Sequence, residues 1–201
     1  MNQIVLASNN SHKLDEFRKI FKEFSINILS LKDLSIDVDP DETGKTFLEN
    51  SSIKATEIRK FTDLPILADD SGLVIPNLDD EPGIFSARYS GKDATDESNR
   101  ELVLKKLHEK NSVNSDAYFV CALTFLDTEE IQVVGKCHGL IKSSEKGSNG
   151  FGYDPIFYVE SEKCTFAEMK CITVKCLIER TVASKCAYHV VSLSKLLENV
   201  T

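Results

Sequence analysis

The feature that most restricts the fold is an apolar segment with two adjacent aspartates at its centre. Residues 66–68 and 73–75 are apolar runs that suit buried strands, and Asp69-Asp70-Ser71-Gly72 lies between them. Adjacent carboxylates repel each other and destabilise a fold unless a cation or hydrogen-bond donors compensate. In a strand they would point to opposite faces, so only one would face a given site. Two interpretations remain open: a tight turn built on Asp and Gly, or a site in which a carboxylate binds Mg²⁺.

The N-terminal residues predict a strand, a polar turn and an amphipathic helix. Residues 4–7 suit a buried strand, and apolar side chains recur at helical spacing over residues 11–24, with Asn10 or Ser11 as the predicted N-cap. A helix N-terminus offers unpaired N–H groups and partial positive charge, so this turn and Lys13 could bind a phosphate. An ordinary capped helix with a surface lysine explains the same residues.

Glycines surround a phenylalanine in the segment GSNGFGYDP at residues 147–155. Glycine lets the backbone approach a ligand closely. An exposed Phe151 would offer a stacking surface for a base, and Asp154 could accept a hydrogen bond from a base edge or a sugar. The competing interpretation is a glycine-rich hairpin with one buried aromatic residue.

Two further stretches carry charges whose role the residues leave open. The acidic run at residues 37–42 contains Asp39, Asp41 and Glu42. Most such runs are solvated faces, but this one could supply a second carboxylate for Mg²⁺. Arg88, within PGIFSARYSG, suits either a phosphate or a structural ion pair.

The rest of the chain predicts alternating helices and strands. Residues 46–60 and 95–110 have the pattern of helices, and residues 117–126 and 131–137 that of two paired strands. Residues 172–197 mix β-branched residues with a helical period and remain undecided. This mixture indicates an α/β or α+β fold.

Charge and composition exclude some classes of function. A net charge of −8 and a pI near 5.1 argue against a protein that coats nucleic acid or a membrane surface, but a polyanionic small molecule stays open as substrate. There is neither a run of 18 apolar residues nor a secretory signal at the first residues, so we expect a cytoplasmic protein. Six cysteines without a C-x-x-C pair are expected to be reduced thiols rather than zinc ligands.

Together these stretches resemble the inosine triphosphate pyrophosphatase family, also called XTP/dITP diphosphatases or Ham1-like proteins. The matching blocks, in family order, are LASNNSHKLDEF at 6–17, DETGKTFLENSSIKA at 41–55, LADDSGLVIPNLDDEPGIFSARYSGKDATDESN at 67–99, GSNGFGYDPIFYV at 147–159 and TFAEM at 165–169. The combination of ADDSG, PGIFSARYSG and NGFGYDPIF is highly specific.

The resemblance implies an α/β fold with an elongated mixed β-sheet, flanking helices and two lobes around a central cleft, formed by residues 1–201 as one two-lobed domain. It implies Mg²⁺-dependent hydrolysis of ITP, dITP or XTP to the monophosphate and pyrophosphate, which cleans the nucleotide pool. It also implies a homodimer, with no nucleic-acid or membrane partner.

The resemblance also implies roles for individual residues. The predicted contacts of the triphosphate are Ser8, Asn9, Asn10 and Lys13. Asp70 would accept the proton and bind Mg²⁺, and Ser71 would contact the substrate. The predicted contacts of the base are Phe151, Gly152, Tyr153 and Asp154. The family usually has Glu-Glu where this chain has Asp41-Glu42, so either of these residues could be the second Mg²⁺ ligand.

The C-terminal block departs from the family pattern of a lysine followed by Ser-His-Arg. Without gaps, that triplet falls on Ile178-Glu179-Arg180, and the lysine falls on Val174, one residue before Lys175. Lys175 and Arg180 are therefore predicted substrate contacts. Glu179 accepts hydrogen bonds, as does O6 of a 6-keto purine, so we expect an altered base preference.

Two other hypotheses stay open at this point. One is a degenerate purine-nucleotide-binding protein with weak or broadened turnover, which the altered C-terminal block favours. The other is a redox or metal sensor built on the cysteines that crowd the C-terminal part of the chain.

Overall fold

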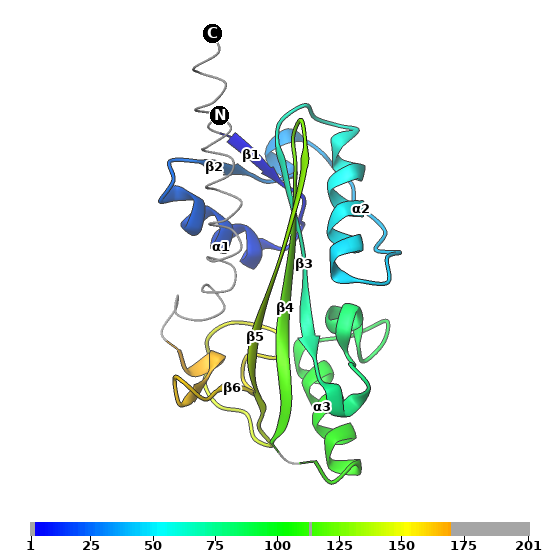
Figure 1. Cartoon of the computed structure of the whole chain (residues 1–201), viewed down its shortest axis with the longest axis vertical. Helices are drawn as coiled ribbons and strands as arrows, with labels where there is room; N and C mark the ends of the chain where they lie inside the picture. Colours follow the sequence, from blue (N-terminus) through cyan, green and yellow to red (C-terminus); the bar gives the residue numbers. More distant parts are fainter. Residues whose placement is uncertain (1–2, 113, 170–201) are drawn as a thin grey trace. The chain divides into compact units, whose positions relative to one another are not determined.

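The computed structural model describes residues 3–112 and 114–169, and seven strands of these residues form one mixed sheet (Figure 1). The strands are β1 (Gln3–Leu6), β2 (Asn27–Leu29), β3 (Ile66–Val74), β4 (Ser115–Leu126), β5 (Glu130–Ile141), β6 (Phe157–Val159) and β7 (Cys164–Thr165). Their order across the sheet is β2-β1-β3-β4-β5-β6-β7. β1 pairs in parallel with β2 and β3, whereas β6 is antiparallel to both of its neighbours. The α/β class with a mixed sheet and flanking helices is therefore confirmed.

The helices begin where polar side chains cap the backbone. The α-helices are α1 (Ser11–Lys22), α2 (Phe47–Arg59) and α3 (Asp96–Glu109). Their N-caps are Asn10, Thr46 and Thr95, whose side chains accept hydrogen bonds from N–H groups of the first turn. The three helix starts predicted from the sequence are thus confirmed to within one residue. Short 3₁₀ helices cover Lys32–Leu34, Pro76–Leu78, Gly83–Arg88 and Phe166–Glu168.

The described residues divide into two compact units. The first contains residues 3–70 and 121–135, and the second contains the described residues of 71–120 and 136–169. β3, β4 and β5 each contribute to both units, because the boundaries fall within these strands. The assignment of residues 1–201 to a single domain stays a prediction.

No described helix combines the length and apolarity needed to cross a lipid bilayer.

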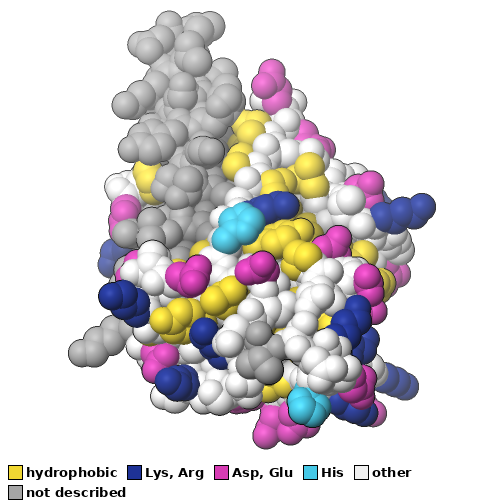
Figure 2. Space-filling model, turned by 60° about the horizontal axis from the view of Figure 1, so that its bottom comes forward, with side chains coloured by type: hydrophobic (Ala, Val, Ile, Leu, Met, Phe, Trp, Pro, Cys, Tyr) yellow, Lys and Arg dark blue, Asp and Glu magenta, His cyan; other side chains and the backbone are white. Residues whose placement is uncertain are grey.

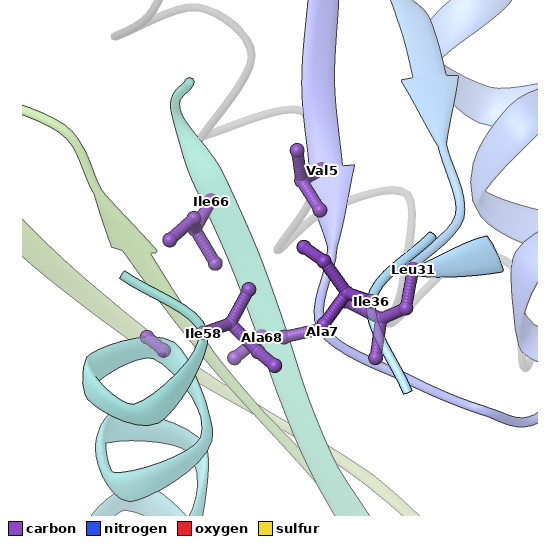
Figure 3. Close-up of a cluster of buried hydrophobic side chains, with 8 residues drawn as sticks. Val5, Ala7, Leu31, Ile36, Ile58, Ile66 and Ala68 are labelled. Atoms are coloured by element: carbon purple, nitrogen blue, oxygen red, sulfur yellow. The ribbon is translucent and has the colours of Figure 1, made fainter. Parts of the chain in front are cut away.

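The core of the first unit follows the alternation of side chains along β1 and β3. α2 covers one face, where the buried cluster consists of Val5, Ala7, Leu31, Ile36, Ala55, Ile58, Ile66 and Ala68 (Figure 3). The intervening residues Ile4, Leu6 and Leu67 are also buried, and alternation places them on the other face, toward α1 (Figure 1). Strands buried on both faces form continuous apolar runs. A polar residue within them needs a partner on the face to which it points.

β3 is one continuous strand, which corrects the prediction of two strands separated at residues 69–72. The strand tolerates two buried aspartates because each carboxylate has its own cationic partner. Lys13 lies against Asp69, and Lys54 lies near Asp70. Both lysines are distant in sequence, so the segment by itself could not reveal this compensation.

Aromatic packing holds the short strands of the second unit. The ring of Phe157 in β6 lies 4.8 Å from that of Phe119 in β4 and 4.7 Å from that of Phe166, measured between centroids. β5 continues to Ile141, beyond the predicted end at residue 137. Gly139 explains the difference: a Cβ there would lie 2.5 Å from the backbone oxygen of Tyr158, so this glycine marks close approach of β6 rather than the end of a strand.

Candidate functional site

Asp69 and Asp70 are buried in β3, with 2% and 6% of their surface exposed, and their partners come from different helices. Asp69 accepts a hydrogen bond from the ammonium of Lys13 on α1, with 2.5 Å between Nζ and Oδ2. Asp70 accepts one from the side-chain amide of Asn50 on α2 at 3.1 Å. Its Oδ1 also lies 3.6 Å from Nζ of Lys54. Alternation along the strand therefore directs the two carboxylates to opposite faces of the sheet.

Asn50 is oriented so that its amide nitrogen donates to Asp70. Its Oδ1 accepts a hydrogen bond from the backbone N–H of Gly44 at 2.8 Å, which turns Nδ2 toward Asp70. A Cβ on Gly44 would lie 2.7 Å from that Oδ1, so only glycine lets the chain approach α2 this closely. Asn50 and Lys54 are four residues apart and therefore share one face of α2.

The carboxylates of Glu42 and Asp70 converge on the ammonium of Lys54. Oε1 of Glu42 lies 2.9 Å from Nζ, and Oδ1 of Asp70 lies 3.6 Å from the same atom. Two carboxylates that share one cation are arranged around the same point, as a cation site with two carboxylate ligands requires. Asp41, the other predicted ligand, has an exposed side chain. The geometry therefore favours Glu42 over Asp41.

The net pKa values of Asp70 and Lys13 are both raised, for different reasons. Burial raises the pKa of Asp70; Lys54 lowers it, Glu42 raises it further, and the net pKa lies above that of an ordinary aspartate. Burial lowers the pKa of Lys13, but the adjacent Asp69 outweighs this effect, and the net pKa is raised. Lys13 thus stays an ammonium that can bind phosphate oxygens, and Asp70 is a stronger proton acceptor than an exposed aspartate.

The turn before α1 is held by its own polar side chains. Oδ1 of Asn10 accepts hydrogen bonds from backbone N–H groups of the first helical turn, including that of Lys13 at 3.3 Å. Oγ of Ser8 accepts one from the N–H of Asn10 at 3.2 Å. The side-chain amide of Asn9 donates to Oδ1 of Asp39 at 3.1 Å. The four predicted triphosphate contacts therefore lie together in one ordered turn of the first unit.

The glycine-rich segment of the second unit is a tight turn that depends on glycine at two positions. Gly147 and Gly150 have φ angles of 81° and 75°, in the left-handed region. A Cβ on Gly150 would lie 2.0 Å from Oδ2 of Asp154, and one on Gly147 would lie 2.2 Å from the carbonyl carbon of Ala167. The backbone of this segment is therefore pressed against its neighbours.

The residues predicted to hold the base close this turn. Oδ2 of the buried Asp154 accepts a hydrogen bond from the N–H of Phe151 at 3.0 Å. Tyr153 is buried, its hydroxyl donates to the backbone oxygen of Ser86 at 2.8 Å, and burial raises its pKa. Phe151 is half-buried. Tyr153 is thus the buried aromatic of the structural interpretation, and Phe151 is the more accessible ring beside it.

Comparison with known proteins relates these features to a family. Residues 4–185 match the model of the Ham1 family. This chain belongs to the Ham1 family. It is 45% identical over 177 residues to the dITP/XTP pyrophosphatase of Clostridium perfringens, which covers 84% of this chain and 87% of the relative. It is 43% identical over 173 residues to the dITP/XTP pyrophosphatase of Coxiella burnetii, which covers 84% and 86%.

Solved structures of Ham1 proteins share the fold. The structure of a HAM1 protein from Coxiella burnetii matches with a TM-score of 0.85 at 38% identity. The match covers 96% of this chain and 100% of the Coxiella burnetii chain. The Staphylococcus aureus Ham1 protein matches with a TM-score of 0.82 at 36% identity, covering 95% and 99%. The resemblance drawn from the sequence blocks is therefore confirmed.

The resemblance implies Mg²⁺, and Glu42 and Asp70 fit such an ion. Both supply hard oxygen donors, and both already face one cationic group. Within residues 3–112 and 114–169, no group of three or more His, Cys, Asp or Glu side chains is placed to hold a metal ion. This composition suits Mg²⁺, which usually takes one or two carboxylates and completes its shell with water and phosphate oxygens.

Sequence reasoning did not single out Asn50 and Lys54, which the structure places against Asp70. Both lie in the block DETGKTFLENSSIKA of the Ham1-like pattern, and their spacing of four on a predicted helix was the available signal. That spacing does not tell which side of the helix meets Asp70. Packing of Ala55 and Ile58 onto the sheet sets the rotation of α2 and so turns Asn50 and Lys54 toward the aspartate.

The predicted site residues not yet placed are Ser71, Arg88, Lys175 and Arg180. Ser71 follows Asp70 directly on β3 and is half-buried. The guanidinium of Arg88 lies over the ring of Phe85, with 5.4 Å from Cζ to the centroid. The predicted contacts Lys175 and Arg180 lie outside the described residues, and so does the Ile178-Glu179-Arg180 departure.

Some of the six cysteines lie within the described residues and others lie outside them. Cys137 and Cys164 are free thiols, and burial raises the pKa of Cys137 to about 11. A raised thiol pKa lowers reactivity, because the thiolate is the reactive form. The sensor hypothesis rests on Cys164, Cys171, Cys176 and Cys186; of these, only Cys164 lies within the described residues.

Proposed function

We propose that this Ham1-family chain hydrolyses non-standard purine nucleoside triphosphates (dITP, XTP and ITP) to the monophosphate and pyrophosphate. Relatives at 45% and 43% identity carry the name dITP/XTP pyrophosphatase. The structural observation that supports the proposal most directly is the convergence of Glu42 and Asp70 on one cationic position. Such a pair suits a divalent cation that brings a polyphosphate to Asp70.

In the proposed reaction, a water molecule attacks the α-phosphorus and its proton passes to the carboxylate of Asp70. A bond forms between the water oxygen and phosphorus as the bond from the α-phosphorus to the bridging oxygen breaks. Pyrophosphate then leaves with the electron pair of the broken bond. Asp70 suits this role because burial raises its pKa and because Asn50 fixes the position of its carboxylate.

Other residues bind and orient the substrate in this proposal. Mg²⁺, held by Asp70 and Glu42, would offset negative charge on the phosphates. Lys13 and the turn at residues 8–10 bind phosphate oxygens, and the turn at residues 151–154 contacts the base. Lys54 keeps the two carboxylates oriented before the cation binds.

The proposal also covers location and assembly. We place the enzyme in the cytoplasm as a homodimer, as its family resemblance implies. On the face seen in Figure 2, the described acidic and basic side chains are interspersed and the basic ones do not gather in one patch. Such a face suits a protein that acts on small molecules.

The test is release of pyrophosphate from dITP, XTP, dATP, dGTP and dTTP, each with and without Mg²⁺. We expect Mg²⁺-dependent release from dITP and XTP. Equal release from all five would show that base selectivity is lost. Binding of dITP without any turnover would instead support a degenerate nucleotide-binding protein.

Glu42→Gln and Asp41→Asn distinguish the two candidate Mg²⁺ ligands. Glu42→Gln is expected to lower kcat/KM for dITP by at least about 10- to 100-fold and to raise the Mg²⁺ concentration that gives half-maximal activity. Asp41→Asn is the matched control and is expected to stay within about threefold of the wild type, because its side chain is exposed. A larger effect from Asp41→Asn would reverse the assignment.

A further inference from the structure

Helix α3 holds the turn at residues 151–154 through both backbone groups of one glycine. Oδ2 of Asp96 accepts a hydrogen bond from the N–H of Gly152 at 2.7 Å. One helical turn later, the guanidinium of Arg100 donates from Nη1 to the carbonyl oxygen of Gly152 at 2.9 Å. Residues four apart lie on the same side of a helix, so α3 presents an acceptor and a donor together to Gly152.

Arg100 is itself held in place by a second contact. Its Nε donates to Oε1 of Glu145 at 2.8 Å, and its side chain is only 13% exposed. Because the guanidinium is a rigid planar group, one contact at Nε orients the Nη1 donor for the other. Glu145 lies just before the glycine-rich segment, so Arg100 links the chain at the start of that segment to Gly152 within it.

The hydrogen bonds from Asp96 and Arg100 restrain the backbone of Gly152. Gly152 has a φ of 61°, and among residues 3–112 and 114–169, its two chain neighbours aside, no atom lies within 4 Å of the position a Cβ would take. Packing by these residues therefore does not fix Gly152 on that side. The two hydrogen bonds from α3 oppose rotation of the peptide groups that connect Phe151 to Tyr153.

We propose that Asp96 and Arg100 are positioning residues for base recognition, and this inference rests on the proposed function. Phe151 and Asp154 flank Gly152 and its neighbour, so their relative placement depends on the backbone between them. A turn that is already ordered before binding loses less conformational entropy when it receives a ligand. The Asp96–Gly152–Arg100 contacts thereby raise affinity for the base without touching it.

The test separates binding of the base from binding of the phosphates. Asp96→Ala and Arg100→Leu are each expected to raise KM for dITP by roughly 10-fold or more, since each removes a hydrogen bond made by a charged group. kcat should change by less than about threefold, and Ki for inorganic tripolyphosphate should stay at its wild-type value. Hydrogen exchange of the peptide covering residues 147–154 should become faster in both variants.

Two further variants exclude a general loss of structure. Asp96→Asn keeps an oxygen that can accept from the N–H of Gly152, so it should restore most of the affinity for dITP. Lys106→Leu breaks an ion pair of α3 with Glu81, 2.5 Å long, that does not involve the turn, and should leave KM for dITP unchanged.

The outcomes are distinct. The inference is overturned if KM stays unchanged in Asp96→Ala and Arg100→Leu, if KM and the tripolyphosphate Ki rise together, or if exchange over residues 147–154 is unaffected. Failure of the proposed function shows itself separately, as absence of dITP hydrolysis by the wild type.

Discussion

Asp70→Asn is expected to lower kcat/KM for dITP by about 100- to 10,000-fold. Asparagine has nearly the same shape as aspartate, but its amide cannot take the proton of the attacking water. It also removes one of the two carboxylates that converge on the Lys54 ammonium. At saturating Mg²⁺ the turnover of dITP should fall by the same factor, because added Mg²⁺ cannot replace a missing proton acceptor.

The same substitution is expected to stabilise the metal-free protein at neutral pH. The pKa of Asp70 is raised in the folded state, chiefly by burial, so its ionised form opposes folding once the pH is above the ordinary aspartate pKa. This opposition grows as the pH rises from there to the folded-state pKa. Asparagine does not ionise, so Asp70→Asn should exceed the wild type in unfolding free energy at pH 7, and the difference should vanish near pH 3.

Urea unfolding at pH 7 and pH 3, in chelator, measures this difference beside the pyrophosphate-release assay. Asp63→Asn is the matched control, because Asp63 belongs to the same unit and is exposed. It should leave both activity and stability close to the wild type. Near-full activity of Asp70→Asn would remove Asp70 from the catalytic role, and loss of activity together with loss of stability would point to misfolding.

Phe157→Ala is expected to lower the free energy of unfolding by about 3–5 kcal/mol. The ring of Phe157 is fully buried and contacts the rings of Phe119 and Phe166. Its removal leaves a cavity that these neighbours, themselves held by the sheet and by the segment around Phe166, cannot fill without moving. β6 begins three residues after the turn at residues 151–154, so the variant should also weaken binding of dITP.

The urea midpoint of Phe157→Ala measures this loss, and Phe61→Ala is its control. Phe61 is 53% exposed, so its truncation removes little buried surface. We expect a change of less than about 1 kcal/mol from Phe61→Ala. Equal destabilisation by the two variants would show that the aromatic cluster of Phe119, Phe157 and Phe166 contributes no more than an exposed ring.

Local chemistry in the sequence was enough to locate the helices. Asn10, Thr46 and Thr95 each lie at the predicted start of a helix, and each caps a helix. A cap is formed by atoms within a few residues of one another, so its signal is contained in a short segment. The strands were located less well, since Asp69 and Asp70 read equally as a turn until the partners on α1 and α2 were known.

In the candidate site, the sequence predicted several of the residues, whereas their contacts came only from the structure. Ser8 to Lys13, Asp70 and the turn at residues 151–154 were predicted through the sequence blocks that resemble the family. Their contacts were not, because Lys13 and Asp69 are 56 positions apart in the chain. Whether Tyr153 or Phe151 is the buried aromatic also required the structure, since the same segment GFGYD fits both interpretations.

By itself, the sequence determined the class of fold, the helix starts and the family to which the chain belongs, because these depend on short-range patterns and contiguous blocks. Only the tertiary structure decided that β3 is continuous, that Glu42 and Asp70 share the ammonium of Lys54, and that Asn50 donates to Asp70. The physical reason is common to all three. A buried carboxylate is stable only beside its compensating groups, and packing of distant helices on the sheet supplies them.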